Sequence, residues 1–335
     1  MAHLFIVRTP MQIVSALEAM HHFQTANNTL VILHNRNKSN PKQIQKVIEI
    51  FNLHVIFDEI IEVPVLHQSK FFRSVELINT LKKRRYEKLF LGLYDSMGKL
   101  FLANLLYSHA YLIDDGTATI VAHRNMYNRL NSRAIGLKEL RALFFGLHIH
   151  SESSLDFFTM FQLKAQANET IITHRFEYLK EFFSQQYHRD NTLYLLGQNI
   201  TDVPILSKES YLCYIQQIVE RYAEREIIYI PHRSETLHHE LYELQNRHFT
   251  IAESTMPIEL YFLINRIYPT HIVSFFTSAL YTLNILFDKS RLESFMIPHE
   301  DIQSRHDNVR ECQRFLEATS VVQTPLQSYA QYNML

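Results

Sequence analysis

Glycine is scarce in this sequence, and tryptophan is absent. Its 335 residues include only 6 glycines and 2 cysteines, whereas an average chain has about 7% glycine. The cysteines, Cys213 and Cys312, are too few for a disulfide framework or a four-thiolate zinc site. They favour a reducing, cytoplasmic compartment. With so few glycines, those present, Gly116 and Gly197 among them, are expected at positions where only glycine suits the backbone.

Long apolar runs are missing as well. No run reaches the roughly 18 residues that a membrane-spanning helix needs. The run Leu4–Val7 near the N-terminus is strand-like and lacks the basic segment and long apolar segment of a signal peptide. These observations predict a soluble protein of the cytoplasm.

Several motifs for cofactors and partners are absent. Neither a Gly-x-Gly-x-x-Gly fingerprint nor a Walker loop occurs, so dinucleotide and ordinary ATP chemistry have no support. Histidine pairs such as His148 and His150 lack a third ligand at metal spacing. The basic run Lys82–Arg85 is typical of a solvated helix end, and no basic motif is interleaved with aromatics. The sequence therefore predicts no cofactor, no metal and no nucleic-acid partner.

The sequence is rich in hydrophobic residues, and its charges are distributed unevenly between its two halves. Hydrophobic residues make up 47% of the chain and aromatics 12%, which indicates a globular protein, and its length favours two domains. Residues 1–150 carry 18 Lys and Arg against 11 Asp and Glu, a net +7, whereas residues 151–335 carry 15 against 23, a net −8. The basic half points to an anionic partner, such as a membrane surface or an acidic acceptor, or to attraction between the two domains.

Short apolar runs alternate with amphipathic helical stretches along the chain. Candidate strands and helices are expected in both halves, and this alternation predicts parallel sheets with crossover helices. We expect an N-terminal α/β domain over residues 1–150, a helical connection over 151–190 and a C-terminal α/β domain over 191–335, with a cleft between the two domains. The expected strands are 3–8, 30–33, 55–57, 88–93, 110–113, 193–196, 227–230, 248–252 and 271–276, and expected helices include 41–51, 209–226 and 278–287.

Because ligands of open parallel sheets bind outside the carboxyl ends of strands, residues at those ends are the first candidates for chemistry. Asp114, Asp115 and Gly116 directly follow one predicted strand. One carboxylate of the pair can face a ligand while the other braces the loop, which suits a general base better than a metal site. An ordinary Asp-Gly turn is the alternative.

Two more strand ends carry unusual residues. His232 and Arg233 follow Pro231 at the end of one strand, and a His-Arg pair suits a phosphate, since arginine is a permanent donor and histidine titrates near neutral pH. Thr277 and Ser278 open a predicted helix, where backbone amides favour an anion. A plain N-cap is the alternative there.

Taken together, these three segments resemble the bacterial sialyltransferases of glycosyltransferase family 52, which act on lipooligosaccharide, and more distantly the polysialyltransferases. Those families share an acidic pair followed by glycine, a motif of histidine and proline, and a downstream hydroxyl pair, in this order. Two departures are that His232 is followed by arginine and that the hydroxyl pair begins with threonine. The remaining similarities are Arg8-Thr9-Pro10-Met11-Gln12, Gly197-Gln198 and Met256-Pro257-Ile258-Glu259.

The resemblance implies a GT-B fold and an inverting, metal-independent transfer of sialic acid from CMP-sialic acid to a terminal galactose-type hydroxyl of lipooligosaccharide or a capsular glycan. It assigns the general base to Asp115, with Asp114 as the alternative, and stabilisation of the departing CMP phosphate to His232. The alternatives are a GT-B enzyme with another sugar nucleotide and a non-catalytic glycan- or nucleotide-binding protein. The implied donor-binding residues are Gly197, Gln198, Arg233, Glu259, Thr277 and Ser278, and the implied acceptor-side residues are Thr9, Gln12 and Gly116.

The lipid-linked acceptor that the resemblance implies, together with the basic first half, predicts peripheral contact with an anionic membrane on its cytoplasmic face. The helical middle segment allows a homodimer. The linkage formed, the acceptor sugar and the number of sugars added are not encoded in these motifs.

Overall fold

The chain folds into two compact units, Met1–Phe182 and Phe183–Leu335. The computed structural model describes residues 1–34, 40–64, 70–128, 137–150, 154–166, 168–184, 186–252 and 256–334. Each unit is an α/β structure with its own parallel sheet and its own buried core. The expected class, α/β with two parallel-sheet units, is confirmed.

The first unit is built on a parallel sheet of seven strands, in the order β3-β2-β1-β4-β5-β6-β7. Its strands are β1 (Ala2–Val7), β2 (Asn28–Leu33), β3 (Glu59–Val63), β4 (Arg85–Leu91), β5 (Leu106–Ile113), β6 (Asp156–Thr159) and β7 (Ile171–Thr173). Its helices are α1 (Pro10–Phe23), α2 (Asn40–Phe51), α3 (Leu53–Ile56), α4 (Lys70–Leu81), α5 (Ser96–Asn104), α6 (Thr117–Asn128), α7 (Leu137–Phe144) and α8 (Glu177–Phe182).

The second unit has a parallel sheet of six strands, in the order β11-β10-β9-β13-β14-β15, and a separate two-stranded pair, β12-β8. Its strands are β8 (His188–Arg189), β9 (Leu193–Leu196), β10 (Ile227–Ile230), β11 (Phe249–Ile251), β12 (Ile267–Tyr268), β13 (His271–Ser274), β14 (Arg291–Met296) and β15 (Val322–Pro325). Its helices are α9 (Lys208–Arg221), α10 (His239–Glu243), α11 (Ile258–Ile264), α12 (Ser278–Leu286), the 3₁₀ turn His299–Asp301, α13 (His306–Glu317) and α14 (Tyr329–Tyr332).

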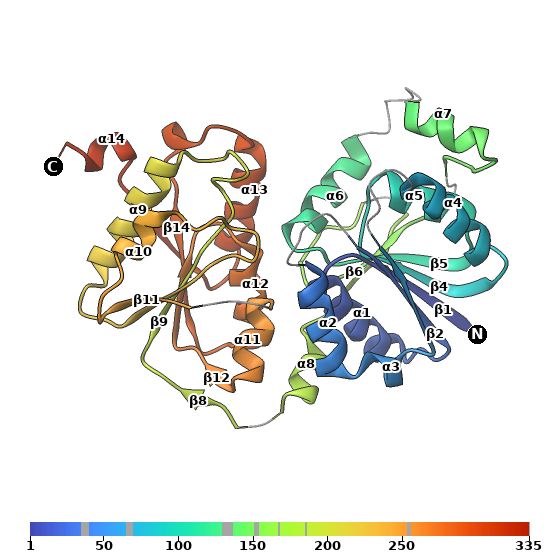
Figure 1. Ribbon diagram of the computed structural model, residues 1–335, viewed down its shortest axis with the longest axis horizontal. Coiled ribbons are helices and arrows are strands. Elements are labelled where there is room, and N and C mark those ends of the chain that lie inside the picture. The colour runs from blue at the N-terminus through green and yellow to red at the C-terminus, as the bar shows by residue number, and fades with distance from the viewer. Residues whose placement is uncertain are drawn as a thin grey trace. The chain divides into compact units, whose positions relative to one another are not determined.

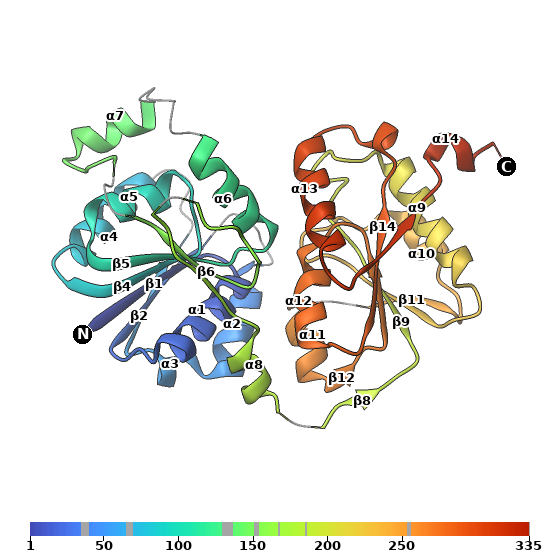
Figure 2. The ribbon, with the colours of Figure 1, turned by 180° about the vertical axis from the view of Figure 1, so that it is seen from behind.

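Helices cover both faces of each sheet, as Figure 1 and the reverse view in Figure 2 show. In the first unit α1 and α2 lie on one face, with α4 and α5 on the other; in the second, α9 and α10 lie opposite α11 and α12. The central strands β1 and β9 are accordingly buried almost throughout, as strands covered on both sides must be.

The first strand leads through a tight turn into α1. Thr9 is the N-cap of α1, its hydroxyl accepts the N–H of Gln12 at 3.3 Å, and Pro10 occupies the first helical position. This arrangement satisfies one of the amides that a helix start leaves unpaired, and proline loses nothing there. The turn therefore places Arg8 at the carboxyl edge of the sheet, directly after β1.

The segment 151–190 differs from the helical connection that the sequence suggested. Its described part contributes β6 and β7 to the first sheet, then α8, and the units divide at Phe182 and Phe183. These strands are only four and three residues long, and strands this short carry almost no periodic signal. Part of this segment therefore completes the first core, since Phe157 of β6 is fully buried.

Two further assignments from the sequence need correction. Residues 55–57, expected as a strand, fall in and after α3, and the strand is Glu59–Val63 instead. This strand is only half-buried and contains glutamates. A search for apolar runs therefore does not detect it. In the second unit, β14 and β15 were not expected, because a buried glutamate, Glu293, interrupts the apolar pattern of β14.

Both sheets reverse their strand order at the strand that comes first in sequence. In the first unit this point lies between β1 and β4, and in the second it lies between β9 and β13. On either side of each point, successive strands are added toward opposite edges of the sheet. Ligands of such sheets bind outside the carboxyl ends of the strands at these points. The residues directly after β1, β4, β9 and β13 are therefore the first to inspect.

We expect Glu293→Gln to destabilise the second unit. Glu293 is fully buried and accepts hydrogen bonds from Tyr222, Thr324 and His271. Although burial alone would raise its pKa, these donors and Arg291 lower the pKa to about 2. The carboxylate therefore stabilises the fold above its unfolded pKa near 4.5, and that contribution is lost as the pH falls toward 2.

At pH 7 the variant is expected to lose about 3 kcal/mol in the free energy of unfolding relative to the wild type. This difference should become smaller as the pH falls below 4.5. Urea unfolding of the full chain at several pH values measures it in the transition of the second unit. Glu317→Gln, an exposed change on α13, is the matched control. Equal stability of Glu293→Gln and the wild type at pH 7 would contradict this account.

Candidate active site

The acidic pair after β5 is divided between two environments. Asp114 is 3% exposed and accepts the Thr159 hydroxyl at 2.5 Å, the Met160 N–H at 2.6 Å and His174 Nε2 at 3.2 Å. Asp115 is half-buried, and its backbone N–H donates to the Thr119 hydroxyl at 2.9 Å. Asp114 is thus an internal anchor, and the residue nearer the surface is Asp115.

Gly116 makes this division possible. Its φ of +59° lies in the left-handed region, where a glycine costs least. The turn carries the chain from the end of β5 into α6, which begins at Thr117. The Asp-Gly turn expected as the alternative is therefore present. Within it the Asp114 carboxylate is buried and the Asp115 carboxylate is half-buried.

Thr9 and Gln12 do not present their side chains to a ligand. Gln12 is 1% exposed, its Oε1 accepts the Arg8 N–H at 2.6 Å, and its Nε2 donates to the Gly92 carbonyl at 2.5 Å. Since Thr9 caps α1, the local structure employs both polar side chains. Both side chains thus position the strand ends, and the expectation that the two residues lie on the acceptor side stays a prediction.

The same edge carries an ion pair that the sequence search missed. Arg8 donates to Asp95 at 2.5 Å, and Asp95 also caps α5 through Met97 and Gly98. Burial would raise the pKa of Asp95, but the Arg8 charge and these bonds hold it below its ordinary value. Arg8 follows β1 and Asp95 lies shortly after β4, so the pair marks the reversal point of the first sheet. The position of Arg8 directly after a buried strand was the available signal.

In the second unit, His232 follows β10 as an exposed residue in a tight turn. Its Nδ1 accepts the Ser234 N–H at 3.2 Å, which leaves Nε2 as the atom that can donate to a ligand. Desolvation by surrounding atoms and the neighbouring Arg233 charge lower the pKa of His232 to about 4. At neutral pH the ring is therefore an uncharged donor.

Glu235, three residues after His232, underlies this turn. It accepts hydrogen bonds from the hydroxyls of Tyr211 and Tyr229 and from the His232 N–H. Burial raises the pKa of Glu235 to about 7. A Cβ on Gly197 would collide with Glu235 and Tyr229, so glycine is required after β9.

Gln198 continues from Gly197 at the reversal point of the second sheet. Its backbone N–H donates to Tyr211 at 3.1 Å. Its side-chain Oε1 is buried and has no hydrogen-bond partner among the described residues. Since buried polar atoms are nearly always bonded, this oxygen is suited to accept from a ligand.

Thr277 and Ser278 open α12 after β13, on the other side of β9. Thr277 is the N-cap and accepts the Ala279 N–H at 3.2 Å, so the cap needs only one of the two hydroxyls. The N-terminus of α12, with its amides and the positive end of the helix dipole, lies beside Ser278.

Glu259 is buried in the first turn of α11 and accepts the Thr282 hydroxyl of α12. Burial raises its pKa, while Thr282 and the Arg233 charge act in the opposite direction. The side chain therefore joins α11 to α12, and it lies within electrostatic range of Arg233 in the turn after β10.

Comparisons with known proteins show the fold. A scan against protein-family models finds no match, and neither does a search of curated proteins. Among solved structures, a UDP-GlcNAc 2-epimerase from Methanocaldococcus jannaschii is 14% identical, with a TM-score of 0.54 over 100% of this chain and 91% of the other. The fold is GT-B. The E. coli heptosyltransferase WaaC with ADP is 11% identical, with a TM-score of 0.46 over 100% of this chain and 97% of that one.

The GT-B fold confirms the fold expected from the sequence, while the site residues remain predictions. Asp115 belongs to the first unit, and His232 and the donor candidates belong to the second. That Asp115 and His232 share one cleft stays a prediction too. No helix among the described residues combines the length and apolarity needed to cross a bilayer.

Proposed function

We propose that this protein is a glycosyltransferase that uses a nucleotide-sugar donor, and that it transfers sialic acid from CMP-sialic acid to a galactose-type hydroxyl of lipooligosaccharide or a capsular glycan. One observation carries the proposal. The strands β10, β9 and β13 are neighbours in the second sheet. Their carboxyl ends carry an uncharged imidazole donor, a buried side-chain carbonyl with no hydrogen-bond partner in the described part of the chain, and a helix start with a second hydroxyl. This set suits a phosphate ester joined to a polar nucleoside.

The donor phosphate is assigned to His232, Arg233 and the start of α12. Arg233 supplies a permanent positive charge, and His232 Nε2 supplies a hydrogen bond without the desolvation cost of a second cation. The Ser278 hydroxyl and the amides of α12 add donors aimed at an anion. Glu259 and Gln198 Oε1 provide acceptors for the nucleoside hydroxyls or the base.

The acceptor hydroxyl is assigned to Asp115. As the anomeric carbon of sialic acid binds the acceptor oxygen, its bond to the phosphate oxygen breaks and CMP departs with that electron pair. The acceptor proton passes to the Asp115 carboxylate. Attack from the face opposite the phosphate inverts the anomeric centre, and the transition state resembles an oxocarbenium ion, as in glycoside hydrolysis. The proposed transfer uses no metal at the phosphate.

A nucleotide sugar is also the ligand named for one protein of similar fold. A UDP-GlcNAc 2-epimerase from M. jannaschii is described in complex with UDP-GlcNAc and UDP, at 14% identity and a TM-score of 0.51 over 97% of this chain and 89% of the other. That likeness supports the ligand class and leaves the base and the sugar open. The cytidine and sialic acid in this proposal rest on the sequence motifs alone.

Incubation of the protein with CMP-sialic acid and a lactose-type acceptor tests the proposal. Release of CMP together with a sialylated product is the expected result. In a parallel thermal-shift series, CMP is expected to raise Tm by mass action. Stabilisation by UDP-sugars and not by CMP would favour a related enzyme with another donor. Stabilisation by glycans or nucleotides without any transfer would favour a binding protein.

A membrane contact is proposed for the first unit at α7. Phe144 is 84% exposed and Phe72 is 48% exposed, while the Arg141 guanidinium lies 5.0 Å from the Phe72 ring centre. Exposed aromatics beside a cation are typical of the interface between lipid headgroups and acyl chains. The net positive charge of residues 1–150 would attract the anionic leaflet.

We expect Phe144→Ser to weaken binding to anionic vesicles about tenfold, because it removes the most exposed aromatic of this patch. Co-sedimentation with vesicles of mixed zwitterionic and anionic lipid measures the change. Val55→Ser, a change at another exposed apolar residue, is the control and should leave binding unaltered. Vesicle binding that does not weaken with added salt would contradict the electrostatic part of the proposal.

A further inference from the structure

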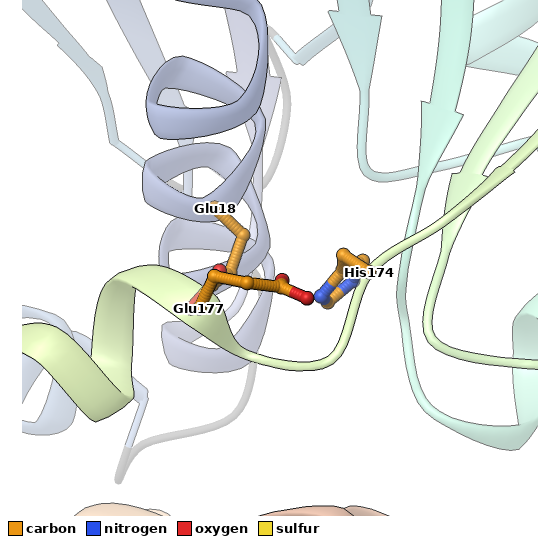
Figure 3. Close-up of side chains that lie close together, drawn as sticks. All are labelled: Glu18, His174 and Glu177. Atoms are coloured by element: carbon orange, nitrogen blue, oxygen red, sulfur yellow. The ribbon is translucent and has the colours of Figure 1, made fainter.

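Three side chains of the first unit converge where α1, the end of β7 and α8 meet. Glu18, His174 and Glu177 each offer one ligand atom, and these atoms all lie within 4.8 Å of one another. Figure 3 shows the three side chains coming together, with a carboxylate oxygen directed at a ring nitrogen of His174. Two carboxylates and an imidazole are a donor set that binds divalent transition metals.

The hydrogen bonds of His174 leave one of its nitrogens for this cluster. His174 is 2% exposed, and its Nε2 lies 3.2 Å from the Asp114 carboxylate. Its Nδ1 is buried and has no hydrogen-bond partner among the described residues. Because a neutral imidazole that donates through Nε2 carries a lone pair on Nδ1, this nitrogen can act as a ligand.

Asp114 supplies the support that metal-bound histidines usually have. A ligating imidazole almost always donates its other N–H to a carboxylate or carbonyl, which fixes its tautomer and raises its basicity. The ring is also held by Phe158, stacked at 4.7 Å between ring centres, and by Phe176 at 5.0 Å, edge to face. The histidine is therefore oriented before any ligand arrives.

The two glutamates are held by backbone amides and still have lone pairs to share. Glu18 is 1% exposed and accepts the N–H groups of Tyr178 and Leu179 at 3.0 and 2.9 Å, at the start of α8. Glu177 is exposed and accepts the Arg175 N–H at 3.0 and 2.9 Å. Since each carboxylate has about four lone-pair sites, a metal can be added without breaking these bonds.

The charges around His174 also favour a cation. Glu18, Glu177 and Asp114 place three carboxyl groups around one imidazole. A divalent ion would offset this concentration of negative charge. The exposed side chain of Glu177 leaves a route for its entry.

We propose that the first unit binds a divalent transition-metal ion of the Zn²⁺ class through Glu18, Glu177 and His174 Nδ1, with Asp114 as the outer partner of the histidine. A water molecule would complete four-coordination. Metal bonds of about 2.1 Å place tetrahedral ligands about 3.4 Å apart, so the side chains must draw together, which the exposed Glu177 can do. The ion would tie α1 to α8, the last helix before the second unit.

Calorimetric titration of the metal-free full chain with Zn²⁺ tests the site. We expect one tight site per chain, weakened at least about tenfold by Glu177→Gln. Glu181→Gln is the matched control, because it removes an equal charge from an exposed residue of the same helix, with no place in the cluster. Asp114→Asn should weaken binding about 10–100-fold, the usual cost of losing an outer partner.

Thermal shift and a spectroscopic readout complete the design, and neither depends on catalysis. Zn²⁺ should raise Tm in the wild type and in Glu181→Gln, but little in Glu177→Gln. Co²⁺ in place of Zn²⁺ should give visible absorption of a four-coordinate site, again lost in Glu177→Gln. If Glu177→Gln and Asp114→Asn bind Zn²⁺ as the wild type does, the metal belongs to surface histidines and the proposal is wrong. Undetectable Zn²⁺ binding by the wild type would overturn it equally.

Discussion

Asp115→Asn is expected to lower kcat about 10²–10⁴-fold, the usual contribution of a general base, while the affinity for CMP stays unchanged. Asparagine keeps the size of the side chain but cannot take the acceptor proton. The change leaves in place the hydrogen bonds from Thr159, Met160 and His174 to Asp114, which anchor the end of β5. Initial rates of sialyl transfer and calorimetric titration with CMP measure the two effects separately.

Asp156→Asn provides the matched control for this prediction. Asp156 begins β6, so the same substitution falls at the amino edge of the same sheet, away from the strand ends where ligands bind. It should leave kcat within about twofold. A fully active Asp115→Asn enzyme would remove Asp115 from the mechanism, whereas a loss of both kcat and CMP binding would indicate a folding defect.

The central part of the fold could be predicted from the sequence because its strands are continuous apolar segments. The strands β1 and β9 are covered by helices on both faces, so almost every position in them is hydrophobic and the pattern is easy to recognise. The strands β6, β7 and β15 are short, and β3 and β14 contain glutamates. Their pairing depends on neighbours distant in sequence, which no local pattern encodes.

The sequence could predict that candidate site residues lie at strand ends. It could not predict which of their side chains are buried. The end of a strand could be located in the sequence, and Asp114, Asp115 and His232 do lie at such ends. Which carboxylate turns inward was undetermined, because Thr159, Met160 and His174, which hold Asp114, come from 45 to 60 residues later. One partner of the Gln12 side chain is also remote, since Gly92 lies 80 residues away.

Two groups of functional interest escaped the sequence analysis because their partners are scattered. Glu235 gains its raised pKa from burial beside Tyr211 and Tyr229, on two other elements. Glu18 and His174 are 156 positions apart in sequence, too far for any metal spacing motif. Sequence motifs detect ligands on one loop or helix, whereas this cluster exists only after α8 has packed on α1.

His232→Ala is expected to lower kcat about 10²–10³-fold, comparable to the loss of one oxyanion donor. As the bond to sialic acid breaks, negative charge grows on the CMP phosphate, and Nε2 of His232 is the proposed donor to it. Since Nδ1 accepts the Ser234 N–H, the donor is already oriented before the reaction. His232→Gln should retain part of the rate, because its amide can also donate.

The pH dependence of CMP binding separates this role from a structural one. The pKa of His232 is about 4 in the free protein, and an adjacent phosphate raises it by favouring the charged ring. Binding therefore takes up protons, and CMP affinity should fall as the pH rises through the higher pKa of the complex. In His232→Ala this component should disappear. His248→Ala, an exposed histidine just before β11 at the amino edge, is the control. A His232→Ala enzyme with wild-type rate and wild-type proton uptake would place the phosphate elsewhere.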